Sequence, residues 1–546
     1  MQRILCALAC ATLAVDAFAS PKFIAHGWDL LDTTPDTLAE SAAEFGATAL
    51  DGVTVCVPET KQADGSTIST LSLPQDAPWR YESVVQYEST LRNIVKHPSL
   101  KECFLLCLWR YHRGRFDWTD DAAWAKFANN MKMFSRLAKR GGMKGIFIDA
   151  EDYTKERQFF RSDSDPAHDE AAALARRRGR EVFTGVFQEF PDATVLSFWF
   201  FSQCREYLES PDPAAMSRQA GDLWSHFMNG ILDAMPMTAT LVDGDECAYK
   251  YDSSAAFDDG AIKQLLRAIP LVAPENRDKF RARMRVGFGQ FIDMYVNEKG
   301  KCGSWYFGPV AGSRLEHFRQ NLMSASHTAE YVWLYGEKFS WVNWKGERPD
   351  SSLWEYSRHT AWESQLPGLA DMLAELRDPV LAAQRTADRL RAAGCTNLFT
   401  ANVHRKWTWF DQNNKGGAFS IEKGKDGEQS SIVADGVRTG ACHVPVDDVK
   451  EGDVYVADLW MNGEPGGVAE VIWCTGGSFN WKLGRYSVST CEVDARGRRR
   501  CSRLFHAPAG ADGLMFRVNA FQSDSGRAAF EDIAIYRVTC SESTAQ

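Results

Sequence analysis

The chain lacks, after its N-terminal segment, any apolar run that approaches the roughly 20 residues of a membrane-spanning helix. It also lacks an excess of positive charge, because 62 Lys and Arg stand against 72 Asp and Glu, giving a net charge of −10. A chain of this charge offers no broad phosphate-binding surface and no polybasic membrane patch. These absences argue against a membrane-spanning protein and against nucleic acid as a partner.

Two further motifs are missing. No Gly-rich phosphate-binding turn follows the first expected strand, which argues against a nucleotide-binding, doubly wound sheet. No His-Glu-x-x-His spacing occurs, and the run Asp243–Glu246 lacks the spacing of an EF-hand loop. We therefore expect neither a metal site nor a cofactor.

The N-terminus has the features of an export signal. Arg3 precedes an apolar run from Ile4 to Val15, and Ala17-Phe18-Ala19 has the small-x-small form of a cleavage site. We expect residues 1–19 to be a signal peptide that is cleaved near Ala19. The mature protein is then secreted or periplasmic.

The pattern of elements predicts two domains. From Lys22 to about Trp341, eight short apolar strands alternate with longer segments of helical period, which predicts a (β/α)8 barrel over residues 20–390. Near Cys395 the pattern changes to short alternating segments separated by Gly, Asp, Asn and Ser. Residues 391–540 are therefore predicted to form an all-β jelly roll or β-sandwich, and residues 541–546 a tail.

The fourth strand, "GIFIDAEDY", ends in acidic residues. Side chains alternate between the two faces of a strand, so Ile146 and Ile148 share one face while Asp149 and Glu151 share the other. The apolar face must cover the outer helices, so both acids are expected to point into the barrel. They lie near the carboxyl end of the strand, where barrel enzymes hold their catalytic groups.

Other strands add acids and aromatic rings at the same end of the barrel. On the eighth strand, Trp333, Tyr335 and Glu337 are predicted to face inward. On the sixth, Asp243 and Asp245 reach the mouth if the face that carries Leu241 is the inner one. The remaining residues expected to line a binding cleft are His26, Trp28, Trp109 and Trp199, although the alternation of the fifth strand leaves Trp199 open.

Several carboxyl groups beside Trp and Tyr rings suit a site that protonates a flat, hydroxyl-rich ligand and stabilises charge on it. Glycoside hydrolysis needs this set, with one carboxylic acid for the leaving oxygen and one carboxylate at the anomeric carbon. The barrel, the export signal and the trailing sandwich resemble the secreted barrel glycoside hydrolases that carry a carbohydrate-binding module. This resemblance implies an oligo- or polysaccharide substrate.

Two catalytic arrangements stay open. Asp149-x-Glu151 is similar to the end of the Asp-x-x-Asp-x-Asp-x-Glu signature of family 18 chitinase-like enzymes, which implies Glu151 as the acid and Asp149 as the neighbour that orients the substrate's N-acetyl group. The other arrangement is a conventional pair of Glu151 with a second carboxylate, for which Glu337 and Asp245 are better placed than Asp293. The rival interpretation is a non-catalytic carbohydrate-binding protein on the same scaffold.

Overall fold

The computed structural model describes residues 21–310, 312–344, 357–404, 407–412, 416–447, 449–462, 467–488, 490–495, 497–521 and 526–538. The expected signal peptide and the expected tail lie outside these residues. The chain divides into two compact units, Met1–Arg377 and Asp378–Gln546. No helix of the described residues is long and apolar enough to cross a membrane.

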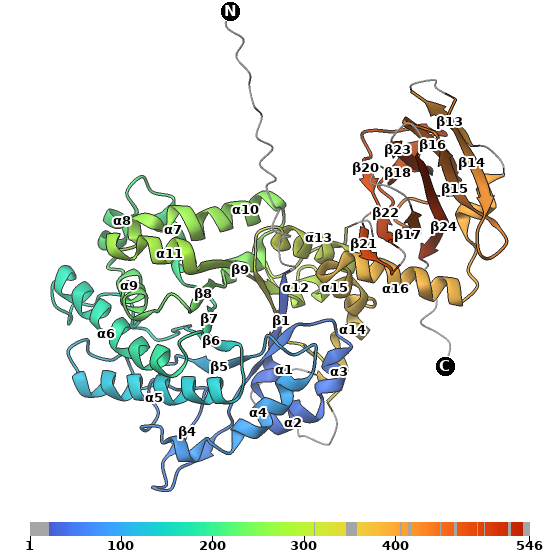
Figure 1. Ribbon diagram of the computed structural model, residues 1–546. Helices are drawn as coiled ribbons and strands as arrows, with labels where there is room; N and C mark the ends of the chain where they lie inside the picture. Colours follow the sequence, from blue (N-terminus) through green and yellow to red (C-terminus); the bar gives the residue numbers. More distant parts are fainter. Residues whose placement is uncertain are drawn as a thin grey trace, which may run out of the picture. The chain divides into compact units, whose positions relative to one another are not determined.

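The first unit is the expected (β/α)8 barrel (Figure 1). Its parallel strands close in the order β1-β10-β9-β8-β7-β6-β5-β2. The strands are β1 (Lys22–Gly27), β2 (Gly52–Val55), β5 (Phe104–Leu108), β6 (Gly145–Asp149), β7 (Thr194–Ser197), β8 (Thr240–Asp243), β9 (Met284–Phe291) and β10 (Tyr331–Gly336). Two small ladders lie outside the barrel, β3 (Thr60–Lys61) with β4 (Thr67–Ile68) and β11 (Phe339–Ser340) with β12 (Ser357–Ala361).

Amphipathic helices cover the barrel. In α5, for example, the buried residues Trp124, Phe127, Met131 and Phe134 recur at helical spacing, so one face packs against the neighbouring elements. The helices of this unit are α1 (Trp28–Leu31), α2 (Pro35–Glu40), α3 (Ala42–Gly46), α4 (Tyr87–Lys96), α5 (Asp121–Arg140), α6 (His168–Glu189), α7 (Arg205–Leu208), α8 (Pro213–Ala220), α9 (Trp224–Ala234), α10 (Ser254–Ile262), α11 (Arg277–Arg283), α12 (Asp293–Val296), α13 (Arg314–Ser326), α14 (Trp362–Gln365) and α15 (Leu369–Arg377).

The strand register decides which side chains enter the lumen. Phe147 of β6 pairs with Leu106 of β5 and with Leu196 of β7, so these side chains share the inner face. The Phe147 ring lies 5.4 Å from His26 and 5.7 Å from Trp333, which confirms the expected inner faces of β1, β6 and β10. Asp149 follows Phe147 on this face.

The same register decides the faces of β7 and β8, which the sequence left open, and places Trp109 after β5 on the outer face, contrary to expectation. Leu196 pairs with Val242, so the inner row of β8 runs through Val242 rather than Asp243. Trp109 follows Cys107 on the outer face of β5, because Leu108 pairs with Asp149. Both faces of these strands are apolar, and alternation alone therefore could not tell inside from outside.

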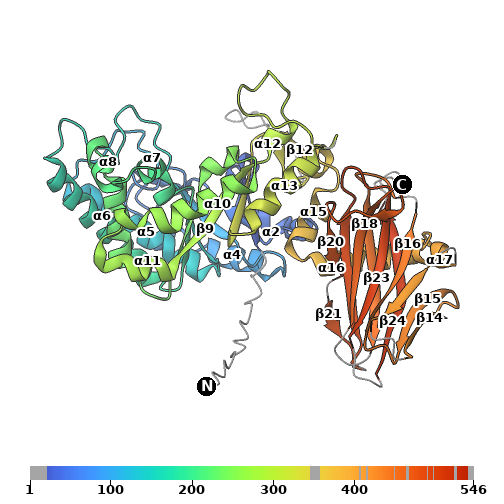
Figure 2. The same ribbon diagram turned by 90° about the horizontal axis from the view of Figure 1, so that it is seen from above.

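The second unit is the expected β-sandwich, whose strands appear side by side in Figure 2. One sheet has the order β13-β16-β23-β18-β19, with β20 also paired to β18. Its strands are β13 (Thr408–Asp411), β16 (Thr439–Val446), β23 (Gly513–Phe521), β18 (Gly467–Thr475), β19 (Ser478–Phe479) and β20 (Arg485–Ser487). The other sheet, β14-β15-β24-β17-β22-β21, contains β14 (Ala418–Lys423), β15 (Gln429–Asp435), β24 (Arg527–Val538), β17 (Val454–Asn462), β22 (Arg499–His506) and β21 (Thr490–Val493).

Two helices complete this unit, α16 (Pro379–Ala392) and α17 (Leu398–Val403). Ala383, Ala387 and Leu390 of α16 pack against Val456 and Tyr536 of the second sheet. This contact places α16 in the sandwich unit, so the division of the chain after Arg377 lies earlier than the boundary near residue 390 that the sequence suggested.

Candidate functional site

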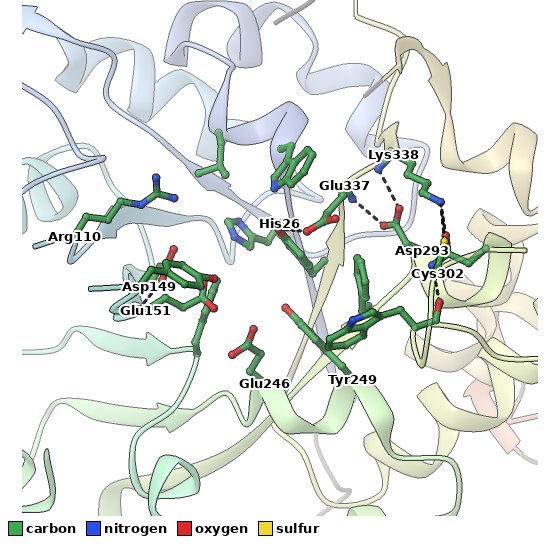
Figure 3. Close-up of a pocket in the computed structure, with 18 of the residues that line it drawn as sticks. His26, Arg110, Asp149, Glu151, Glu246, Tyr249, Asp293, Cys302, Glu337 and Lys338 are labelled. Atoms are coloured by element: carbon green, nitrogen blue, oxygen red, sulfur yellow. Dashed lines mark hydrogen bonds between the residues drawn. The ribbon is translucent and has the colours of Figure 1, made fainter. Parts of the chain in front are cut away.

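A cavity of about 900 Å³ opens at the carboxyl ends of the barrel strands. Its volume lies in the range of small-molecule sites. Figure 3 shows Asp149 and Glu151 on one side and Asp293 with Lys338 on the other, while Glu246 and Glu337 point into the space between. The residues that line it are His26, Trp28, Leu31, Arg110, Tyr111, His112, Asp149, Glu151, Tyr153, Thr154, Phe198, Glu246, Tyr249, Phe291, Asp293, Asn297, Cys302, Trp305, Tyr335, Glu337 and Lys338.

Asp149 and Glu151 reach the cavity as the sequence predicted. β6 ends at Asp149, whose Oδ1 accepts a hydrogen bond from the Glu151 backbone N–H at 3.0 Å. Burial, followed by the charge of Glu151, raises the pKa of Asp149 to about 7. Burial also raises the pKa of Glu151, while the Tyr153 hydroxyl and then the positive charge of Arg110 oppose the rise. The pair therefore keeps protons that free carboxyl groups would lose.

Glu246 is a cavity acid that the sequence prediction missed. It lies on the inward parity of β8, after Val242 and Gly244, and the chain turns at Asp245, whose φ of 33° is left-handed. Burial, then the charges of Glu151, Asp149 and Asp245, raises the pKa of Glu246 to about 8. Glu246 is therefore mostly protonated at neutral pH. Glu246 is the last residue of "DGDE" in the sequence, but the sequence prediction chose Asp243 and Asp245, which lie on the other face of the strand.

Asp243 and Asp245 do not reach the cavity, which corrects their expected placement at the mouth. Asp243 is fully buried and accepts hydrogen bonds from the backbone N–H groups of Phe200 and Ser202, each at 2.8 Å. Asp245 accepts one from the Tyr251 hydroxyl at 3.0 Å. Both acids lie on the outer parity of β8 and fix neighbouring segments.

Glu337 occupies the opposite side of the cavity. Its Oε1 accepts a hydrogen bond from the Tyr335 hydroxyl at 2.9 Å, and its backbone N–H donates to Asp293 Oδ2 at 2.8 Å. Burial and then the charge of Glu151 raise the pKa of Glu337, and the Tyr335 hydroxyl and the charge of Lys338 oppose this rise. Asp293 also accepts the Lys338 backbone N–H, and its pKa is raised to about 7 by burial. Asp293 thus holds the turn that presents Glu337.

The expected aromatic residues divide into two groups. Trp28 and Tyr335 line the cavity beside His26, whose Nδ1 lies 2.9 Å from Thr54 Oγ1. Burial lowers the pKa of His26 to about 3, so the imidazole is neutral. Trp333 lies beneath this layer, fully buried and stacked on Phe198, with Nε1 donating to the Gly244 carbonyl at 2.7 Å.

Trp109 and Trp199 lie elsewhere. Trp109 is fully buried on the outer side of the barrel, with its ring 5.3 Å from Phe127 and 6.0 Å from Phe227, so the expectation that it contacts a ligand was wrong. Trp199 lines a separate hollow next to Glu151. Rings that the sequence prediction did not include, Tyr249, Phe291 and Trp305, complete the cavity wall.

The sandwich has an exposed aromatic row on the outer face of its first sheet. Phe410 stacks on His443 at 6.0 Å, His443 lies 5.5 Å from Phe479, and Phe479 stacks on Trp481 at 5.5 Å. Trp481 is 57% exposed. On the same face, Asn519 and Arg485 donate hydrogen bonds to the buried Glu470 at 2.7 and 2.8 Å.

Among the described residues, no group of three or more His, Cys, Asp or Glu side chains is arranged to hold a metal ion. The carboxyl groups of the cavity are instead separated around its wall (Figure 3). Their arrangement suits proton transfer and charge stabilisation on a bound molecule.

No family model matches the chain, and no curated protein matches it. Among solved structures, a CBM22-1–GH10 fragment of Clostridium thermocellum endo-1,4-β-D-xylanase 10B shares 14% identity over 28% of this chain and 29% of its own, with a TM-score of 0.19. The CBM22-1 xylan-binding domain of Paenibacillus barcinonensis Xyn10C shares 12% identity over 27% of this chain and 94% of its own, with a TM-score of 0.19. The enzymatically active domain of bacteriophage CBA120 tailspike protein 4 shares 12% identity over 24% of this chain and 20% of its own, with a TM-score of 0.20. These values are too low to assign a family, substrate or activity.

Proposed function

We propose that the barrel is a glycoside hydrolase that uses carboxyl groups as acid and as nucleophile or base. The observation that supports this most is the convergence of Glu151, Glu246 and Glu337 on one aromatic-walled cavity (Figure 3). A sugar ring presents hydroxyls to the carboxyl groups and C–H faces to the rings. Cleavage of its glycosidic bond needs one protonated and one ionised carboxyl group.

The two sides of the cavity suit different roles. On the side of Glu151, burial raises the pKa of both acids, and the charge of Glu151 raises that of Asp149 further, so we assign proton donation to Glu151 with Asp149 as its partner. On the other side, burial and then the charge of Glu151 raise the pKa of Glu337, while the Tyr335 hydroxyl and the Lys338 charge oppose this rise and stabilise its carboxylate. Because Glu337 faces Glu151 across the cavity (Figure 3) and its carboxylate has these two partners, we assign it as the nucleophile, or as the base that activates water.

Glu246 has a third role in this scheme. With a pKa of about 8 it is mostly neutral at pH 7, and a neutral carboxylic acid can donate a hydrogen bond to a substrate hydroxyl. Its O–H is then a fixed donor in a buried site. We therefore assign substrate binding, rather than the second catalytic carboxylate, to Glu246.

Activity tests this proposal directly. The purified protein is incubated with plant, algal and mucin glycans, and release of reducing ends is measured. Glu151→Gln should lower kcat by about 10²–10⁴-fold on natural glycosides and much less on glycosyl fluorides, whose leaving group needs no proton. Glu337→Gln should inactivate the enzyme on both. Binding by the wild type without release of reducing ends would favour the non-catalytic alternative.

The stereochemistry of the product identifies the role of Glu337. If Glu337 is a nucleophile, the first product seen by ¹H NMR keeps the anomeric configuration of the substrate. If it activates water, the configuration inverts. Either result is compatible with Glu151 as the proton donor.

We also propose that the sandwich binds glycan through the row Phe410, His443, Phe479 and Trp481. Neighbouring exposed rings offer surface for stacking on sugar units, and the polar Glu470 cluster lies on the same face of the sheet. In pull-down assays with insoluble cellulose, xylan and chitin, the full chain should bind at least one polymer. The double variant Phe479→Ala/Trp481→Ala should lose this binding while hydrolysis of short oligosaccharides persists.

Export remains a proposal that rests on residues 1–19. Expression of the full gene in a secreting bacterial host should yield mature protein whose N-terminus, read by sequencing, begins near Ser20. Retention of the full N-terminus on protein recovered from the cytosol would contradict it.

A further inference from the structure

A second, smaller hollow adjoins the main cavity at Glu151. It has a volume of about 180 Å³, and it shares Glu151 and Tyr153 with the main cavity. Its lining residues are Ala150, Glu151, Asp152, Tyr153, Arg157, Phe159, Phe160, Trp199, Gln203 and Trp224. Glu151 therefore stands on the border between two hollows rather than at the bottom of one.

The wall of this hollow is aromatic and firmly supported. Trp224 is buried, its Nε1 donates to the Phe200 carbonyl at 2.7 Å, and its ring packs edge-on against Phe159 at 4.7 Å. Trp199 and Phe160 are half-buried and leave part of their surfaces open. A ring that enters the hollow thus meets aromatic surface that is already in place.

Two polar side chains of the hollow, Arg157 and Gln203, are available to a ligand. The Arg157 guanidinium lies 5.9 Å from the centre of the Phe160 ring, and it makes no hydrogen bond or ion pair with another described residue. Gln203 likewise has no side-chain hydrogen bond within the described part of the chain. The N–H groups of Arg157 and Gln203 can donate hydrogen bonds to the hydroxyl groups of a sugar that stacks on the neighbouring aromatic rings.

The loop that separates the two hollows is fixed by Asp152. Its Oδ1 accepts the Thr154 backbone N–H at 3.0 Å, and its Oδ2 accepts the Gln158 backbone N–H at 2.6 Å. Tyr153, at 79% exposed, projects from this loop and its hydroxyl is hydrogen-bonded to Glu151. The loop therefore holds the proton donor at a set position between the hollows.

We infer that the small hollow binds one sugar unit on the leaving-group side of the scissile bond, stacked on Trp199 and Phe160 and hydrogen-bonded by Arg157 and Gln203. This inference rests on the proposed hydrolase function and specifies its substrate. The main cavity holds the sugar whose anomeric carbon reacts, and the glycosidic oxygen lies over Glu151. The substrate is therefore at least a disaccharide, and its leaving group is a sugar.

The proposed hydrolysis at Glu151 consumes one water molecule. The bond between the anomeric carbon and the glycosidic oxygen breaks, and the Glu151 proton passes to that oxygen, which leaves with the sugar in the small hollow. Water supplies the new hydroxyl on the anomeric carbon. If Glu337 is the nucleophile, the remaining proton of the water returns to Glu151; if Glu337 activates the water, that proton passes to Glu337 and is exchanged through solvent to Glu151.

The volume of the small hollow supports the binding of a single sugar ring there. The hollow of about 180 Å³ is smaller than the 300–1,000 Å³ common for whole small-molecule sites, whereas the main cavity of about 900 Å³ lies within that range. The leaving side is thus short, and longer chains must extend into solvent beyond Arg157.

Substrates with and without a leaving-side sugar test the inference. Oligosaccharides of two to six glucose, xylose, mannose or N-acetylglucosamine units are compared with the fluorides of the same sugars, which carry nothing into the small hollow. Trp199→Ala should lower kcat/KM about 10- to 100-fold on the oligosaccharides, with fluoride hydrolysis unchanged. Arg157→Ala should act in the same direction, and Trp199→Phe should recover most of the loss.

Trp409→Ala, which removes an indole from the sandwich, is the matched control and should leave both activities at wild-type values. Equal losses on oligosaccharides and fluorides, or no loss on either, would overturn the inference while the hydrolase function stands. A wild-type protein that hydrolyses neither substrate class would overturn the proposed function and this inference together.

Discussion

Replacement of Glu246 by glutamine should stabilise the protein at pH 8 and change it little at pH 5. Glutamine has nearly the shape of the protonated acid, so the fold is retained. Burial and the charges of Glu151 and Asp149 raise the pKa of Glu246 from 4.5 to about 8. Between these values the folded protein binds a proton that the unfolded chain releases, so the free energy of unfolding falls as the pH rises.

The size of the effect follows from the same two pKa values. A full shift from 4.5 to about 8 corresponds to about 5 kcal/mol at 1.4 kcal/mol per pH unit. Glu246 is partly open to the cavity, and water there reduces the penalty, so we expect about 2–4 kcal/mol. Because glutamine carries no charge, Glu246→Gln removes the fall in the free energy of unfolding that ionisation of Glu246 causes between pH 5 and 8.

Differential scanning calorimetry of the full chain at pH 5, 6, 7 and 8 measures the effect. The Tm difference between Glu246→Gln and wild type should grow steadily with pH over this range. Glu40→Gln, an exposed substitution at the end of α2, is the control and should run parallel to wild type. If the Glu246→Gln and wild-type curves also run parallel from pH 5 to 8, Glu246 is not held protonated in the folded protein and the reasoning fails.

Three further outcomes follow from the same geometry. Glu246→Gln should keep kcat within about tenfold of wild type at pH 7, because glutamine also donates a hydrogen bond; inactivity equal to that of Glu337→Gln would instead identify Glu246 as a catalytic carboxylate. Arg110→Ala removes a charge that opposes the raised pKa of Glu151, so the alkaline limb of the kcat/KM profile should move to higher pH, and a shift to lower pH would contradict this. Asp243→Ala leaves the Phe200 and Ser202 N–H groups unpaired and should cost about 2–4 kcal/mol, seen as a lower Tm, whereas loss of activity at unchanged Tm would restore the catalytic role expected from the sequence.

The sequence alone predicted the two-domain architecture and the side of the cavity that carries Asp149 and Glu151. β6 has an apolar row at Ile146 and Ile148 and acids on the other row, so alternation alone pointed Asp149 and Glu151 inward. On β8 both rows are apolar, and only the pairing of Leu196 with Val242 decides that Glu246 rather than Asp245 enters the cavity. Register depends on neighbouring strands that are distant in the sequence, which is why local pattern could not supply it.

The loops account for the other residues that the sequence prediction missed. Tyr249 and Trp305 reach the cavity from segments that follow β8 and β9, where no strand period constrains the direction of a side chain. The placement of Tyr249 depends on the absence of a side chain at Gly289 of β9, where a Cβ would come within 2.8 Å of the Tyr249 ring. A glycine on the inner face of a barrel strand thus indicates that an aromatic ring from another segment packs there, but it does not identify that ring.

The proposed two-carboxylate reaction needs one protonated and one ionised carboxyl group, and the cavity acids have different neighbours on its two sides. Asp149, Glu151 and Glu246 influence one another, so ionising any of them raises the pKa of the others and the cluster retains protons at neutral pH. Burial and the charge of Glu151 also raise the pKa of Glu337, but the Tyr335 hydroxyl and the Lys338 charge oppose this rise. In the proposed reaction, a sugar bound between them meets Glu151 as the acid on one side and Glu337 as the carboxylate on the other. Because Glu151 also borders the small hollow, the proposed proton donor lies where a sugar that leaves into this hollow would need the proton.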